Sequence, residues 1–182
     1  MRSSEALKAG IHSRTLCRLR EEGILDLVSR GIYRLADQKP ISNPDLVTVA
    51  IRIPQAVVCL ISALAFHELT TQIPHAVYIA LIKGAEPPRL EHPPLSVHRF
   101  SNASLNAGIE EHRLDGVKVR IYGPEKTLAD VFKFRNKIGM DLVLEALKLY
   151  KVRKIFNLGE LLKYARICRV EKVIRPYLEG MM

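Results

Sequence analysis

The sequence predicts an α+β fold in which short helices come first, a mainly antiparallel sheet follows and helices close the chain. Helix caps and an apolar stripe mark the first part, and apolar and polar side chains alternate over several later segments. Helical signals return after residue 122. The 182 residues are enough for one full domain and a small additional module.

The start of the chain predicts two short helices and a β-hairpin. Serines precede the first helix within residues 3 to 10, and Ser13 is the expected N-cap of the second helix, which has an apolar inner stripe. The segment VSRGIYRL, residues 28 to 35, then forms a hairpin, because Gly31 tolerates a positive φ at its turn. This order of elements is typical of a winged helix-turn-helix.

The second helix and the hairpin carry the residues that we expect to contact DNA. The start of a recognition helix meets base edges and phosphates, because its dipole and free amides favour anions. A wing presents its turn to the DNA backbone or minor groove, and its returning strand to a phosphate. Arg14 is the first choice for a base or phosphate contact. The expected DNA-binding residues are Ser13, Arg14, Thr15, Arg18, Arg30 and Arg34.

A polar segment with two prolines, residues 36 to 44, predicts a linker. It separates a winged helix-turn-helix domain over residues 1–39 from a larger α+β domain over residues 40–182. An Asp-Gly pair between alternating segments of the larger domain is a strong two-residue turn signal. The expected elements there are helices from Asn43 and over about 54 to 69, strands over 76 to 82 and 95 to 100, a hairpin closed by Asp115 and Gly116, and helices that start near Pro124, Asp141 and Asn157.

Positive charge is concentrated at both ends of the chain. The formal net charge is +9. Residues 1–40 hold eight Lys/Arg against five Asp/Glu, residues 41–112 hold four against six, and residues 113–182 hold sixteen against eight. Such a distribution favours a polyanionic partner, although basic charge also serves solubility alone.

The cysteines and the apolar runs indicate a reduced, cytoplasmic protein. Cys17, Cys59 and Cys168 are an odd number of thiols at wide spacing, which fits neither a disulfide framework nor a zinc site. The N-terminus lacks a secretory apolar core. The longest apolar run, residues 56–66, is shorter than the roughly 18 residues needed to cross a bilayer, so we expect no membrane partner.

Motifs for enzyme chemistry are weak. Glu125 and Lys126 are adjacent at an expected helix start, which fits capping better than the metal-binding strand of a nuclease. A nucleotidyltransferase needs a Gly-Ser pair and an Asp-x-Asp pair, and the sequence contains neither. His67 is expected to be a hydrogen-bonded structural residue. The remaining histidines that we considered lack metal-ligand spacing, so we expect no metal, cofactor or catalytic residue; these are His92, His98 and His112.

Three segments together resemble the AbiEi antitoxins of type IV, abortive-infection toxin-antitoxin systems. They are VSRGIYRL after SRTLCRLREEG, VVCLISALAFHELTTQIP, and RIYGPEKTLADVFKFRNKIGMDLVLEALK. The resemblance covers nearly the whole chain. It implies an N-terminal winged helix that represses the promoter of its own operon. It also implies a C-terminal domain that counteracts a nucleotidyltransferase-like toxin without a stable direct complex.

The resemblance places the four arginines of the first module against double-stranded operator DNA. It also makes Lys126, Lys133, Arg135 and Lys137 candidates for a second basic surface. A homo-oligomer on DNA is plausible, because one small winged helix makes few contacts. Two alternatives stay open at this stage. One is a protein-interaction module that binds a toxin or another partner directly, without DNA; the other is a hydrolase built around His67.

Overall fold

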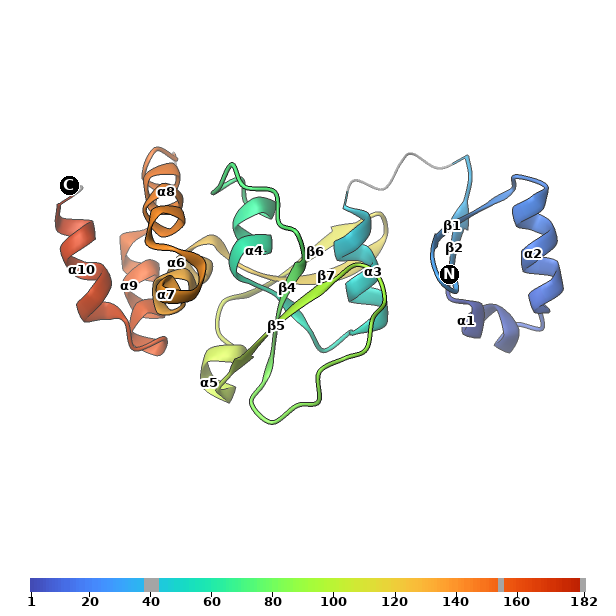
Figure 1. The fold of residues 1–182 in the computed structure, drawn as a ribbon, viewed down its shortest axis with the longest axis horizontal. Helices are drawn as coiled ribbons and strands as arrows, with labels where there is room; N and C mark the ends of the chain where they lie inside the picture. Colours follow the sequence, from blue (N-terminus) through green and yellow to red (C-terminus); the bar gives the residue numbers. More distant parts are fainter. Residues whose placement is uncertain (38–42, 154–155, 181–182) are drawn as a thin grey trace.

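The computed structural model describes residues 1–37, 43–153 and 156–180. The described part is elongated, with an N-terminal module at one end, a five-stranded sheet in the middle and a group of helices at the other end (Figure 1). The expected α+β class is confirmed. In chain order the elements are α1 (Ser3–Lys8), α2 (Ser13–Glu21), β1 (Leu25–Ser29), β2 (Ile32–Leu35), α3 (Pro44–Arg52), β3 (Val57–Val58), α4 (Leu60–Phe66), β4 (Val77–Ile82), β5 (Leu95–Phe100), α5 (Asn102–Leu105), β6 (Ile109–Leu114), β7 (Val117–Tyr122), α6 (Pro124–Lys133), α7 (Arg135–Ile138), α8 (Met140–Lys151), α9 (Leu158–Ile167) and α10 (Glu171–Glu179).

The N-terminal module, residues 1–37, consists of α1, α2 and the antiparallel hairpin of β1 and β2. One cluster of buried residues forms its core, Ala6, Leu16 and Leu25, and Ile32 on β2 is buried as well. Gly31 has φ +72° at the hairpin turn, and a Cβ there would lie 2.8 Å from Ser3 Oγ. The amide of Ser3 donates to the carbonyl of Gly31 at 2.9 Å. A glycine at the turn therefore lets the start of α1 pack against the hairpin.

The sheet has the strand order β5-β4-β3-β7-β6 and is mixed. The pairs β3–β4 and β6–β7 are antiparallel, whereas β4–β5 and β3–β7 are parallel. The expectation of a mainly antiparallel sheet is therefore wrong. Parallel neighbours need a long crossover, and residues 83–94 provide one between β4 and β5.

The apolar run at residues 56–66 divides between a strand and a helix. We expected one helix over residues 54–69, but Val57 and Val58 form β3, and α4 occupies only Leu60–Phe66. Leu60, the first residue of α4, takes a positive φ of 47° where the chain leaves β3. An apolar run has no polar face to show its period, so periodicity does not separate a buried strand from a buried helix.

Other expected strands of the five-stranded sheet are confirmed. β5 covers residues 95–100, and β4 begins one residue later than expected. Leu114 pairs with Val117 across the Asp115-Gly116 turn, so the predicted hairpin is present.

Two helices, α6 and α9, form the centre of the larger core on one side of the sheet. α6 begins at Pro124, as predicted, and all of its residues from Lys126 to Phe132 are buried. It ends earlier than expected, because α7 forms a separate short helix before Gly139. Asn157 caps α9 as predicted: its Oδ1 accepts from the amide of Glu160 at 3.0 Å.

Described residues of the N-terminal module contact α3 and the segment between β4 and β5. The Arg2 guanidinium donates to the carbonyl of Ile51 at the end of α3. A cavity of about 690 Å³ lies between the hairpin, α3 and the β6–β7 turn. The predicted boundary at residues 39 and 40, and most of the predicted linker, lie outside the described residues. Within the described ranges, none of the helices combines the length and the apolarity required to span a bilayer.

Candidate functional site

α2 carries the first group of expected DNA-binding residues. Ser13, Arg14 and Arg18 are exposed, and Thr15 is half-buried. Leu16 is buried in the core of the module, which turns the arginines toward solvent. Arg18 Nε lies 3.5 Å from Glu22 Oε1 in an exposed pair along the helix. Two cationic side chains therefore stand on the first two turns of α2.

The start of α2 differs by one residue from the prediction. His12 rather than Ser13 is the N-cap, and its side chain makes no capping hydrogen bond. The amides of Thr15 and Leu16 bond to the carbonyl of His12. Without a side-chain cap, the positive end of the helix dipole is open to an anionic group from outside.

The hairpin carries the second group, and both of its arginines already contact carboxylates. Arg30 Nη1 lies 3.4 Å from Oε1 of Glu91, and both side chains are more than four-fifths exposed. Arg34 Nη2 donates to Asp26 Oδ2 at 2.7 Å across the strands and is half-buried. Figure 1 shows α2 on the outer side of the module and the hairpin on the side of α3. The two groups thus lie on different parts of the module.

The expected second basic surface is only partly exposed. Lys133 and Lys137 are exposed, and Arg135 is half-buried with Nη1 donating to the carbonyl of Phe132 at 2.9 Å. Lys126 is completely buried, so its assignment to this surface is wrong. Its neighbours on α6 face the core, and an ion pair with Asp130 makes burial of its charge tolerable.

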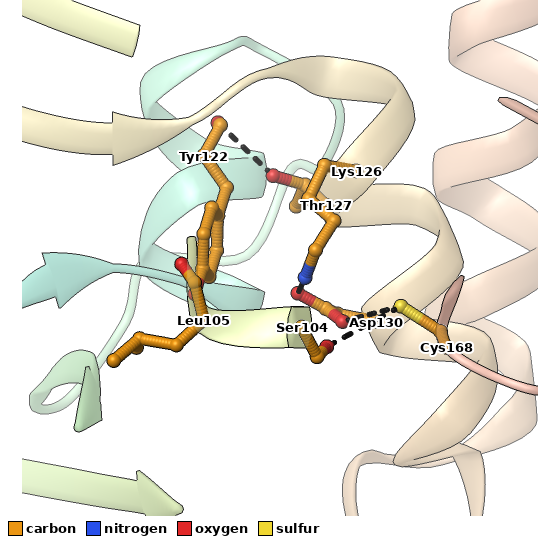
Figure 2. A network of polar contacts seen from close by, with 7 residues as sticks. All are labelled: Ser104, Leu105, Tyr122, Lys126, Thr127, Asp130 and Cys168. Atoms are coloured by element: carbon orange, nitrogen blue, oxygen red, sulfur yellow. Dashed lines mark hydrogen bonds and ion pairs between the residues drawn. The ribbon is translucent and has the colours of Figure 1, made fainter. Parts of the chain in front are cut away.

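Lys126 belongs instead to a buried polar network at the junction of α5, α6 and α9 (Figure 2). Its Nζ pairs with Asp130 Oδ2 and lies 4.1 Å from the centre of the Tyr122 ring. Cys168 Sγ donates to Asp130 Oδ1 at 3.1 Å and lies 3.7 Å from Ser104 Oγ. Every charged group of the network thus has a partner of opposite charge or a hydrogen bond.

The hydrogen bonds of Tyr122 and Thr127 hold the end of β7 against α5 and α6. The Tyr122 hydroxyl donates to the carbonyl of Leu105 at 2.8 Å, and Thr127 Oγ1 donates to the carbonyl of Tyr122 at 3.1 Å (Figure 2). Burial, followed by the charge of Asp130, raises the pKa of Cys168 to about 12. A neutral, buried thiol is a poor nucleophile, and its hydrogen bonds link the end of α9 to α5 and α6.

Three potential metal ligands that are distant in the sequence lie close together in the fold. His67 caps the C-terminal end of α4, and Glu110 and His112 lie two residues apart on β6. One ligand atom of each residue lies within 4.8 Å of the other two. Burial is the main reason why the pKa of His67 is lowered. Glu110 and His112 share a strand face and could have been paired from sequence, but the approach of His67 depends on the tertiary fold.

The sequence matches no protein-family model, and no curated protein is similar to it at a significant level.

Proposed function

We propose that the protein is a DNA-binding antitoxin that represses transcription of its own type IV toxin-antitoxin operon. The observation that carries the proposal is exposed Arg14 in the first turn of α2, where no side chain caps the helix, together with exposed Arg18 one turn further along. A helix start with free amides and guanidinium groups suits phosphates and base edges. The order of α1, α2 and the hairpin fits a winged helix-turn-helix, with α2 as its recognition helix.

The resemblance to the AbiEi antitoxins supplies the biological part of the proposal. The operon would also encode a nucleotidyltransferase-like toxin, which the antitoxin counteracts without a stable direct complex. The protein would act on double-stranded operator DNA in the cytoplasm, without a cofactor and with no catalytic step of its own. Its binding would draw on several copies along the operator, because a single module offers little contact surface.

Arg30 has a conditional role in this proposal. Its exposed ion pair with Glu91 would have to open before the guanidinium reached DNA. Pairs of this kind contribute about 0 to 1 kcal/mol, so a phosphate could replace the carboxylate at small cost. Arg34 is held more firmly by Asp26 inside the hairpin. We therefore rank Arg14 first as a DNA contact, because Arg18 forms an exposed pair with Glu22 of the same kind as that of Arg30, and Arg34 is held inside the hairpin.

The test is a mobility-shift titration of the full chain on the DNA upstream of its own gene, at two salt concentrations. Arg14→Ala/Arg18→Ala should weaken binding by about tenfold to a hundredfold and reduce the slope of log K against log salt by about two. The matched control, Lys148→Ala/Lys172→Ala, removes two exposed lysines from helices at the other end of the molecule (Figure 1). It should bind like the wild type. Equal binding by both double variants, or no preference for the upstream DNA, would refute the proposal.

One observation favours a protein-interaction module instead. The hairpin arginines contact carboxylates of the chain itself, as in a structural element. This alternative expects a stoichiometric complex with the toxin in size-exclusion chromatography, unchanged by Arg14→Ala/Arg18→Ala. The antitoxin proposal expects separate elution of the two proteins.

A further inference from the structure

We propose that His67, Glu110 and His112 form a binding site for a borderline divalent cation, with Zn²⁺ as the best match. The site joins the C-terminal end of α4 to β6, one of the two edge strands of the sheet. It lies outside the N-terminal module and does not depend on DNA binding.

The donor set suits zinc. Two imidazoles and one carboxylate provide the three protein ligands of many open zinc sites, and a water or another small ligand completes the tetrahedron. Ligand atoms about 2.0 to 2.1 Å from a tetrahedral zinc ion are about 3.3 Å from one another. His112 Nε2 and Glu110 Oε2 are already 3.0 Å apart, and the complete triad spans at most 4.8 Å. Zinc binding would therefore require the three donor atoms to move closer together than they lie in the structure.

The surroundings of His67 orient its ring. Nε2 of His67 lies 2.8 Å from the carbonyl oxygen of Tyr122, which can only accept a hydrogen bond. Nε2 must therefore carry the proton, and the neutral ring keeps its lone pair on Nδ1. A backbone carbonyl, like a carboxylate or a water, is a common partner for the second nitrogen of a metal-binding histidine. The carbonyl of His67 itself accepts from Arg153, which fixes the end of α4.

Packing also restricts the two ligands on β6. A Cβ at position 123 would lie 2.5 Å from Glu110 Oε1, so the carboxylate rests directly against the backbone of Gly123. The Phe66 ring meets the His112 ring edge-on, with centroids 4.8 Å apart. His112 must exchange its hydrogen bond to Glu110 for the metal, which requires only that its neutral ring carry the proton on Nδ1. The carboxylate supplies the negative charge that partly balances the cation.

Isothermal titration of the untagged full chain with ZnCl₂ tests the proposal. We expect one zinc ion per chain, with affinity reduced by about a hundredfold in Glu110→Gln and in His112→Gln. The controls are His75→Ala and Cys17→Ser, which remove an exposed histidine and the exposed thiol elsewhere in the chain. Both controls should bind as the wild type does.

A second measurement keeps the test independent of folding defects. Zinc should raise the thermal midpoint of the wild type, chelation should reverse the increase, and Glu110→Gln should remove the response while its circular dichroism spectrum stays native. The proposal is wrong if zinc does not bind, or if natively folded Glu110→Gln and His112→Gln bind it as tightly as the wild type.

Discussion

The ion pair of Lys126 and Asp130 explains why Lys126 is buried, although the sequence predicted it to lie on a basic surface. Both side chains are completely buried on successive turns of α6. Taking two charges out of water costs several kcal/mol each, and their attraction returns most of this only while both are present. Tyr122 adds a ring under the ammonium group, and Cys168 adds a hydrogen bond to the carboxylate. We therefore expect the pair to contribute more to the choice of one packing arrangement than to net stability.

Lys126→Met should lower the free energy of unfolding by about 3 to 5 kcal/mol, because it leaves Asp130 buried without its cation. Lys126→Met/Asp130→Leu should regain most of this loss. Urea unfolding followed by circular dichroism measures both. A single variant as stable as the wild type, or a double variant no better than the single one, would contradict the argument.

The same single variant should respond to pH. Burial raises the pKa of Asp130, and the charge of Lys126 opposes that increase. Without Lys126 the folded-state pKa rises further above the unfolded value of about 3.9. A raised carboxyl pKa means that the folded state binds the proton more tightly, so the destabilisation should be smallest in acid and grow as the pH rises.

At the scale of elements, the β6–β7 hairpin is a case in which the local sequence is sufficient to predict the structure. Asp115 and Gly116 both have positive φ, 49° and 79°, as a two-residue turn with the right twist requires. No other atoms lie within 4 Å of a Cβ placed on Gly116, so only the backbone conformation selects glycine there. The Asn157 cap of α9 is another element that local sequence determined.

Gly116→Ala should lower the free energy of unfolding by about 1 to 2 kcal/mol through strain at positive φ. Gly159→Ala is the matched control, because Gly159 lies in the first turn of α9 with only ordinary contacts around it. Gly159→Ala should raise the free energy of unfolding by about 0.4 to 1 kcal/mol. Urea unfolding at one pH compares the two variants, and changes of the same sign would show that turn geometry is not the cause.

At the scale of the whole molecule, stability is distributed unevenly. The described residues of the N-terminal module include only four buried apolar side chains, whereas two much larger clusters cover the faces of the five-stranded sheet. Folded units below about 40 residues seldom stand alone without disulfides or metals. The module therefore depends on contacts with α3 and its neighbours, such as that between Arg2 and Ile51.

A fragment of residues 43–182 should fold by itself and unfold in one cooperative transition, and a peptide of residues 1–37 should lack stable structure. Circular dichroism with urea titration measures both, and the full chain is the reference. The fragment should also lose binding to the upstream DNA. Cooperative unfolding of the short peptide would contradict this view of the module.

Local patterns predicted much of the fold, and long-range contacts account for what was missed. Caps, prolines and the Asp-Gly pair identified α6, α9 and the β6–β7 hairpin, because these signals act within a few residues. The division of the apolar run into β3 and α4 and the parallel pairing of β4 with β5 depend on what each segment packs against. Charge counts likewise cannot tell an exposed lysine from a paired, buried one such as Lys126.

The candidate sites show the same limit. Sequence order identified the α2 arginines, and the structure places them in solvent. Glu91, the partner of Arg30, is 61 positions away from it in the sequence. His67 and His112 are 45 positions apart. Local spacing in the sequence could therefore not predict either contact.

β3, which has only two residues, joins the pair β4–β5 to the pair β6–β7 in the sheet. Val58 faces Ile79 on β4 and Ile121 on β7, so it lies at the one point where the described strands of the two halves meet. If β3 detached, the sheet would separate into the pairs β4–β5 and β6–β7. Each pair would then expose an unpaired edge with apolar residues. Bared edges of this kind recruit strands from other molecules. We therefore expect the resistance of the protein to aggregation to depend on this pair of valines, and Val58 lies opposite Ile121, the cross-strand partner of Glu110 in the proposed zinc site.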